Sequence, residues 1–170
     1  MKSFNFVVMV GLILFIGIQS NYCQDAEAFL SAAFTGNLEI INSYLDNGGD
    51  VNVTDEKGCS ALFLATYLDE KVSLEAVKIL LDHGANVNAQ TNTTQQTALM
   101  NASDVGNLEV VKLLLEKGAD PKIKDMFKET ALDIARIRGN DEVVKFLMLQ
   151  RTDNPKKKDR IEERMNRRKK

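Results

Sequence analysis

Residues 107–125 read NLEVVKLLLEKGADPKIKD, and this stretch decides the fold. Its apolar residues recur at a spacing of three and four, which lines one face of a helix. They are Leu108, Val111, Leu114 and Leu115. Gly118 follows where a helix commonly ends in a residue with positive φ, and Pro121 prevents the helix from continuing. The stretch therefore predicts an amphipathic helix that stops at Gly-Ala-Asp and continues as a short polar extension.

The same pattern occurs at three other places in the chain. Residues 37–55 read NLEIINSYLDNGGDVNVTD, residues 73–90 read SLEAVKILLDHGANVNAQ, and residues 140–150 begin it again with NDEVVKFLMLQ. A second piece precedes each copy: AFLSAAFTG (28–36), SALFLAT (60–66), TALMNASDVG (97–106) and TALDIARIRG (130–139). Each unit is therefore predicted to contain a short helix, a turn, a longer amphipathic helix and an extended loop.

These units resemble ankyrin repeats, whose period is about 33 residues. The family's Thr-Pro-Leu-His motif appears as SALF, TALM and TALD, starting at Ser60, Thr97 and Thr130, without the Pro or the His. We expect these three hydroxyls to cap the first helix of each unit. The resemblance implies an all-α repeat solenoid of four stacked helix-turn-helix units joined by β-hairpin-like loops. One such unit cannot bury its apolar face alone, so stacking supplies the core.

The predicted domain organisation has three parts. Residues 1–23 are interpreted as a signal peptide, residues 24–150 as the ankyrin repeat domain, and residues 151–170 as a basic, flexible C-terminal tail. The four units are expected at approximately 24–54, 55–90, 91–124 and 125–150.

The N-terminal segment has the layout of a secretory signal peptide, with Lys2 followed by an apolar run over residues 6–18 and a polar region. The run is shorter than the roughly 20 residues that a bilayer crossing needs. Cleavage after Ser20 and cleavage after Cys23 both fit. An uncleaved membrane anchor and lipid attachment at Cys23 are alternatives, although Tyr22 is a poor residue before a lipidated cysteine. We expect export to a periplasmic or secreted location.

Charge is divided unevenly along the chain. Residues 25–150 carry 20 acidic and 11 basic side chains, a net charge of −9, whereas residues 151–170 carry 10 basic and 4 acidic ones, a net charge of +6. The tail therefore predicts salt-dependent binding of anionic lipid, an acidic protein or nucleic acid, or folding back onto the acidic repeats. The tail residues assigned to this binding are Lys156, Lys157, Lys158, Arg167 and Arg168.

The sequence contains little material for catalysis. His83 is the one histidine, and it falls at the end of a predicted helix, where a cation is tolerated. Cys59 is expected to be a surface thiol, since nothing nearby is obviously electropositive. No phosphate-binding loop, dinucleotide loop or nucleophile elbow is present. We therefore expect no enzyme, no cofactor, no metal and no small-molecule substrate.

The resemblance implies a surface for an unidentified protein partner, formed by the hairpin tips and the inner face of the first helices. Carried over by position, this surface comprises Phe34, Tyr67, Leu68, Asp104, Met126, Phe127, Ile137 and Arg138. Phe34, Tyr67 and Phe127 are the expected anchors because aromatic residues are enriched in binding hot spots. Val105 occupies a further position on the inner face of these helices, and packing between units is the alternative for Val105 and Ile137.

The expected function is a non-catalytic protein–protein interaction module that acts as a monomer in an extracytoplasmic compartment. The alternative is a peripheral membrane or polyanion binder that acts through the basic tail.

Overall fold

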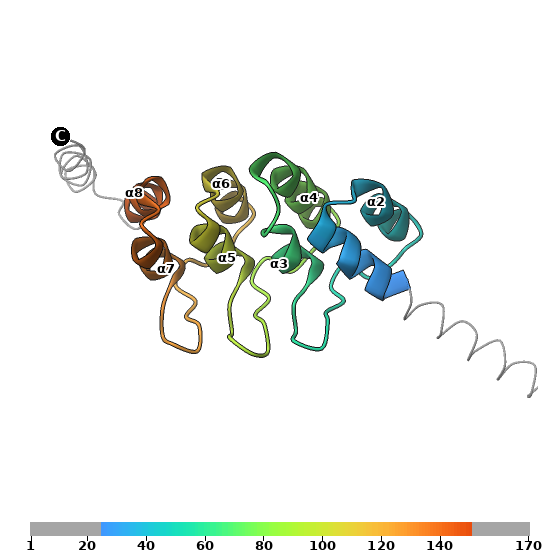
Figure 1. Cartoon of the computed structure of the whole chain (residues 1–170), viewed down its shortest axis with the longest axis horizontal. Helices are drawn as coiled ribbons and strands as arrows, with labels where there is room; N and C mark the ends of the chain where they lie inside the picture. Colours follow the sequence, from blue (N-terminus) through green and yellow to red (C-terminus); the bar gives the residue numbers. More distant parts are fainter. Residues whose placement is uncertain (1–24, 151–170) are drawn as a thin grey trace, which may run out of the picture.

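The computed structural model describes residues 25–150 and is an all-helical solenoid of four stacked helix pairs (Figure 1). The predicted fold is confirmed. The predicted signal peptide (residues 1–23) and the predicted flexible tail (residues 151–170) lie outside the described residues. The helices span residues 25–35, α2 (Leu38–Asp46), α3 (Ala61–Ala65), α4 (Glu70–Asp82), α5 (Ala98–Val105), α6 (Leu108–Glu116), α7 (Ala131–Arg138) and α8 (Asp141–Gln150).

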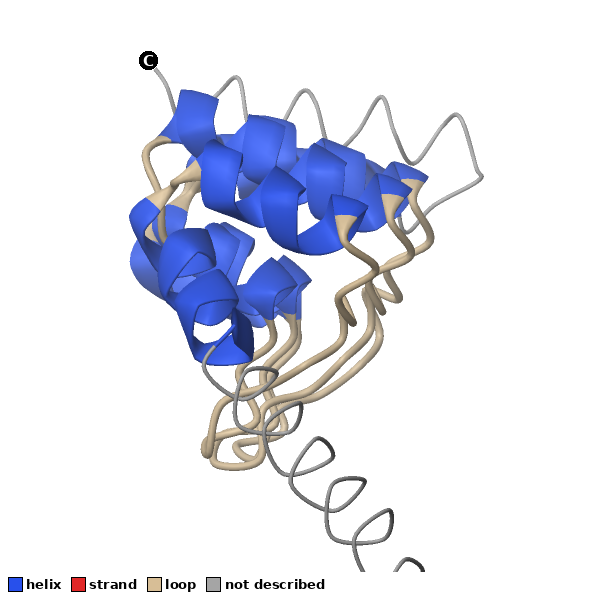
Figure 2. Ribbon diagram, turned by 90° about the vertical axis from the view of Figure 1, so that its right-hand side faces the viewer, coloured by secondary structure: helices blue, strands red, loops and turns tan. Residues whose placement is uncertain are grey.

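Stacking produces two helical layers, with the long loops projecting on one side (Figure 2). The inner layer holds α3, α5 and α7, and the outer layer holds α2, α4, α6 and α8; the contacts α5–α7, α3–α5 and α4–α6 join neighbouring units. No β-strand forms between residues 25 and 150, and the hairpin-like loops contain one isolated bridge, between Thr54 and Ser60.

A continuous apolar core runs through all four units. Leu80 of α4 and Leu114 of α6 are fully buried, as the repeated leucine pairs predict. The alanines of the inner helices, such as Ala65 and Ala102, are also fully buried, and their small side chains let neighbouring helices approach closely. Burying one leucine contributes about 1.5–3 kcal/mol, so stacking supplies most of the stability of each unit.

The predicted hydroxyl caps are present. The side chains of Ser60, Thr97 and Thr130 accept hydrogen bonds from the backbone N–H groups three residues ahead, at 3.3, 3.3 and 3.4 Å. Each cap satisfies an N–H that the helix itself leaves unpaired. The short inner helices therefore begin at the positions that the repeated Ser/Thr residues predict.

An asparagine ladder ties the extended segments of successive units together. Asn52 accepts a hydrogen bond from the Asn86 N–H at 2.8 Å, and Asn88 accepts one from the Asp120 N–H at 2.8 Å. The Asn88 amide also donates to the Gly118 carbonyl at 3.3 Å. These bonds satisfy backbone groups that a segment without strand pairing would leave to solvent.

Replacing Asn88 with alanine is expected to lower the free energy of unfolding by about 1–2 kcal/mol, because two inter-unit hydrogen bonds are lost. Urea denaturation followed by circular dichroism measures the change. Asn92→Ala is the matched control, since Asn92 is exposed and no side-chain hydrogen bond is recorded for it. Equal midpoints for the two variants would contradict the structural role of the ladder.

The hairpin turns contain a left-handed residue at equivalent positions. Gly58 occupies this position in the second unit with φ 75°, whereas Lys128 occupies it in the fourth unit with φ 66°. A side chain raises the energy of this backbone conformation, which glycine adopts without cost. The hairpin of the fourth unit is therefore strained at a position where the hairpin of the second unit is not.

Lys128→Gly is expected to stabilise the protein by about 1 kcal/mol, because the strain of the left-handed backbone disappears. Thermal denaturation should show a higher midpoint than for the wild type. Lys124→Gly is the control for loss of a nearby lysine, and it should lower the midpoint because Lys124 does not have positive φ. A lower midpoint for Lys128→Gly would refute the strain.

Candidate protein-binding surface

The exposed large apolar side chains lie almost entirely on the inner helices and hairpins. Most of them had been assigned to binding from the sequence, and Ile40 on α2 is the exception. Their exposed fractions are Phe34 55%, Ile40 41%, Tyr67 50%, Val105 49%, Met126 49%, Phe127 66% and Ile137 66%. Val105 and Ile137 are therefore exposed and are not enclosed between units.

One position of the inner helix recurs on this face in every unit. Phe34, Tyr67, Asp104 and Ile137 each lie two residues after a buried alanine, so the stack places them in one row. We call these four residues the inner row. Three of them are apolar or aromatic and exposed, and the third member in chain order is an acid. The row therefore offers a partner both apolar area and a fixed charge.

Aromatic contacts define one half of the inner row. The Phe34 and Tyr67 rings meet edge to face with centroids 6.3 Å apart, and Tyr67 also meets the buried Phe63 ring at 5.6 Å. Such pairs fix ring orientation. Burial raises the pKa of the Tyr67 hydroxyl, and Cys59 and Asp104 add to the shift. Tyr67 is thus a preorganised, neutral aromatic with its outer edge exposed.

Leu68 has a different environment from the other predicted residues. It is half-buried and packs against the core. A Cβ atom added at Gly36 would lie 2.7 Å from Val72 Cγ1 and 3.4 Å from Leu68. Gly36 therefore permits the close contact of the first two units. The structure makes Leu68 part of that contact, so its side chain is only partly exposed.

A pocket of about 300 Å³ forms the other half of the candidate surface. It lies where the last hairpin meets α5 and α7, and it brings together Asp104, Phe127, Ile137 and Arg138 of the predicted set. The Arg138 Nε donates to Asp104 Oδ1 at 2.5 Å, which joins neighbouring inner helices. The remaining lining residues are Gln96, Asp125, Glu129 and Ile134.

Neighbouring hairpin tips are joined by backbone hydrogen bonds. The Asn92 N–H donates to the Lys57 carbonyl at 2.8 Å, and the Met126 N–H donates to the Thr94 carbonyl at 3.0 Å. Met126 therefore lies on the row of tips and does not line the pocket. These bonds align the tips of three successive hairpins, and the pocket joins the last tip to the inner row through Phe127, Asp104 and Ile137.

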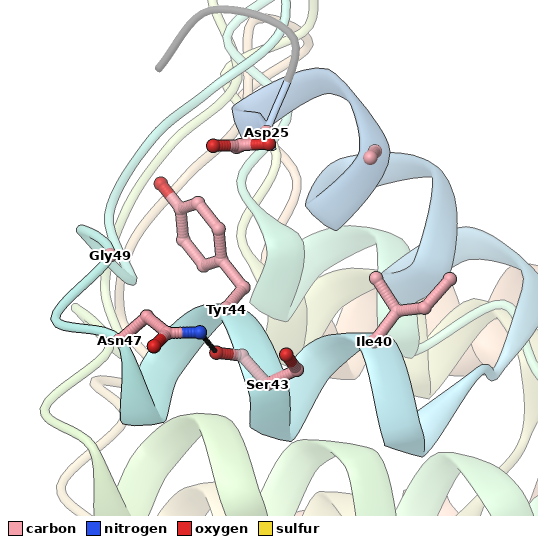
Figure 3. Close-up of a pocket in the computed structure, with 7 residues that line it drawn as sticks. Asp25, Ile40, Ser43, Tyr44, Asn47 and Gly49 are labelled. Atoms are coloured by element: carbon pink, nitrogen blue, oxygen red, sulfur yellow. Dashed lines mark hydrogen bonds between the residues drawn. The ribbon is translucent and has the colours of Figure 1, made fainter. Parts of the chain in front are cut away.

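Sequence reasoning missed a second pocket, between the helix over residues 25–35 and α2 (Figure 3). Tyr44 forms one wall and stacks on Phe29 with centroids 4.3 Å apart. Asn47 donates its amide to the Ser43 carbonyl at 2.7 Å. No repeated motif marks this pocket, because it belongs to the first unit alone.

The reactive side chains have ordinary structural environments. The His83 Nδ1 lies 2.8 Å from the Ile79 carbonyl at the end of α4, as expected for a helix C-terminus. Burial raises the pKa of the half-buried Cys59 thiol, and the Asp55 carboxylate raises it further. Residues 25–150 hold no group of three or more potential metal ligands. None of the helices in the same range is long and apolar enough to cross a membrane.

Comparison with known proteins agrees with the fold. The family described as "Ankyrin repeats (3 copies)" matches residues 29–125, and "Ankyrin repeats (many copies)" matches residues 105–148. The chain belongs to the ankyrin-repeat proteins. Ankyrin repeats are generally protein–protein interaction modules without catalytic activity.

Proteins from several organisms are similar to this chain. An ankyrin repeat-containing protein of Treponema pallidum (strain Nichols) is 32% identical over 144 residues, which cover 85% of this chain and 47% of the relative. The B-cell lymphoma 3 protein homolog of Mus musculus is 41% identical over 119 residues, 69% of this chain and 25% of the relative. The chain thus spans about half the length of the first relative and a quarter of the second.

The tail residues Lys156, Lys157, Lys158, Arg167 and Arg168 lie outside the described residues. Their assignment to anionic partners remains a prediction.

Proposed function

We propose that this protein is an extracytoplasmic binding module that recognises another protein through its inner row and hairpin tips. The observation that carries the proposal is the continuous face on which Phe34, Tyr67, Ile137 and Phe127 are each at least half exposed. Isolated exposed apolar residues are ordinary, but a contiguous set marks an interaction site. A monomer is the proposed state.

The extracytoplasmic location rests on the sequence of residues 1–23, which has the order of a signal peptide. N-terminal sequencing of the protein purified from its own host tests it. A mature chain that begins at Asn21 or Gln24 would support export with cleavage. An intact Met1 in a soluble fraction would exclude it.

Affinity capture from a native extract tests the binding function itself. One bait is the whole chain and the other ends at Gln150. Retrieval of the same protein by both baits supports binding through the repeats. If the longer bait alone retrieves a partner, and salt removes it, then residues 151–170 carry the binding and the proposal is wrong.

Binding to lipid vesicles tests the alternative, in which the protein binds polyanions through its basic tail. Vesicles that contain anionic lipid should bind the whole chain at low salt but should not bind the chain that ends at Gln150.

A further inference from the structure

The pocket beside the last hairpin carries more negative than positive charge. Three carboxylates and one guanidinium line it, from Asp104, Asp125, Glu129 and Arg138. Arg138 is already paired with Asp104. Among the residues that the structure describes, Asp125 and Glu129 have no recorded cationic partner. The pocket therefore carries negative charge that Arg138 does not neutralise, and a further cation can pair with it.

Asp125 gives the stronger indication. Its side chain is 1% exposed, and its Oδ1 accepts hydrogen bonds from the Phe127 and Glu129 N–H groups, both at 2.9 Å. Its Oδ2 is buried and has no hydrogen-bond partner within residues 25–150. A buried carboxylate oxygen without a donor is unfavourable, and a charged donor relieves it more strongly than a neutral one does. The position favours a guanidinium or an ammonium group.

Apolar side chains complete the pocket. Phe127 and Ile137 are both 66% exposed, and Ile134 is buried behind them. Carboxylates beside exposed apolar surface fit a chain in which a basic residue is followed by an apolar one, because the stem of Lys or Arg and the apolar neighbour cover the walls.

The chain contains such a segment. Residues 151–170 have a net charge of +6, against −9 for residues 25–150, and they include the pairs Arg160-Ile161 and Arg164-Met165. We propose that this C-terminal segment binds in the pocket of its own chain, with a basic side chain directed at Asp125. The inference rests on the proposed function in one respect, namely that the pocket belongs to the partner-binding face.

The connection between α7 and α8 brings the start of the C-terminal segment close to the pocket. Only Gly139 and Asn140 separate α7 from α8, so the two helices form an antiparallel hairpin. Gln150 therefore lies at the end of the unit where the last hairpin enters α7 at Thr130, and the two helices pair at one end of the stack (Figure 1). The ten residues 151–160 span up to about 33 Å when extended. This is several times the roughly 10 Å diameter of one helix, so the segment is long enough to reach the pocket.

Tethering makes weak contacts sufficient. A segment joined to its site by a short linker has an effective concentration in the millimolar range. The bound segment would cover Phe127 and Ile137, so a partner would have to displace it. The contact is electrostatic and should weaken with salt.

Carbodiimide cross-linking of the whole purified chain tests this inference, because the reagent joins lysine amines to carboxylates that they contact. Peptide mapping of the monomer should show Lys156, Lys157 or Lys158 joined to Glu129 or Asp104. The yield should fall about fivefold in 1 M NaCl, where the Debye length is about 3 Å.

Asp125→Asn supplies the decisive variant. It keeps an oxygen for the two backbone N–H groups, removes the charge, and leaves both cross-linkable acids in place. We expect it to lower the yield about fivefold, since the amide NH2 that replaces Oδ2 carries no charge and cannot accept a hydrogen bond from the basic side chain. Glu75→Gln on α4 makes the same change of charge on an exposed residue of the outer layer and should leave the yield unchanged.

Four outcomes would overturn the inference: no cross-link to the pocket, cross-links spread over all exposed carboxylates, cross-links found in dimers alone, or an unchanged yield in Asp125→Asn. Partner capture by the chain ending at Gln150 is read separately. Retained capture with no pocket cross-link removes this inference and leaves the proposed function standing. Pocket cross-links without partner capture by either bait would support this inference and remove the proposed function.

Discussion

Replacing Phe34, Tyr67 and Phe127 together with serine is expected to abolish partner binding while the helical content is retained. Aromatic hot spots at interfaces commonly contribute about 2 kcal/mol each. A loss of even 1.4 kcal/mol at each of three positions weakens binding about 1,000-fold. The Kd for the captured partner, measured by isothermal titration, gives the effect, and far-UV circular dichroism gives the helical content.

Ile40→Ser is the matched control for this triple variant. Ile40 is 41% exposed but lies on α2, outside the inner row and the hairpins. It should bind the partner as the wild type does. A triple variant that folds and keeps wild-type affinity would show that these aromatic residues are not the anchors. Tyr67 also packs on Phe63. The melting temperature of the triple variant is therefore compared with that of the wild type, to separate a loss of stability from a loss of binding.

Leu114→Ala is expected to lower the free energy of unfolding by about 2–5 kcal/mol. Leu114 is fully buried in the core, so truncation leaves a cavity where α6 packs in the stack. Because each unit depends on its neighbours for its core, the loss should destabilise the units on both sides. Chemical denaturation followed by circular dichroism measures the change.

Ile137→Ala serves as the control for this loss of aliphatic carbons. Its side chain is 66% exposed, so its removal should change the free energy of unfolding by less than about 0.5 kcal/mol. It should nevertheless weaken partner binding. If Leu114→Ala and Ile137→Ala lowered the free energy of unfolding equally, the assignment of Leu114 to the core and of Ile137 to the binding face would be contradicted.

Much of the fold could be predicted because the local signals recur in register. Ser60, Thr97 and Thr130 mark the helix starts, and the structure places a side-chain cap at each. Gly118 marks a helix end and has φ 92° there. Chain geometry alone imposes such signals, and they are readable in one sequence.

The site could be predicted only in part. Exposure of Phe127 followed from its place at a hairpin tip, but the pocket beside it depends on how the last hairpin folds against α5 and α7. The buried, unpaired Oδ2 of Asp125 could not be read from the sequence either. Leu68 was assigned to the surface by its position in the repeat, and its packing beside Gly36 of the first unit could not be read from spacing.

The proposed function requires that the inner row and the hairpin tips together form the partner-binding face. Hydrogen exchange of the protein alone and with its captured partner measures this directly. We predict slower exchange for amides in the three hairpins and at the ends of the inner helices, including Phe127 and Ile137, with no change in α2, α4 and α6. Protection confined to the outer helices would contradict the claim.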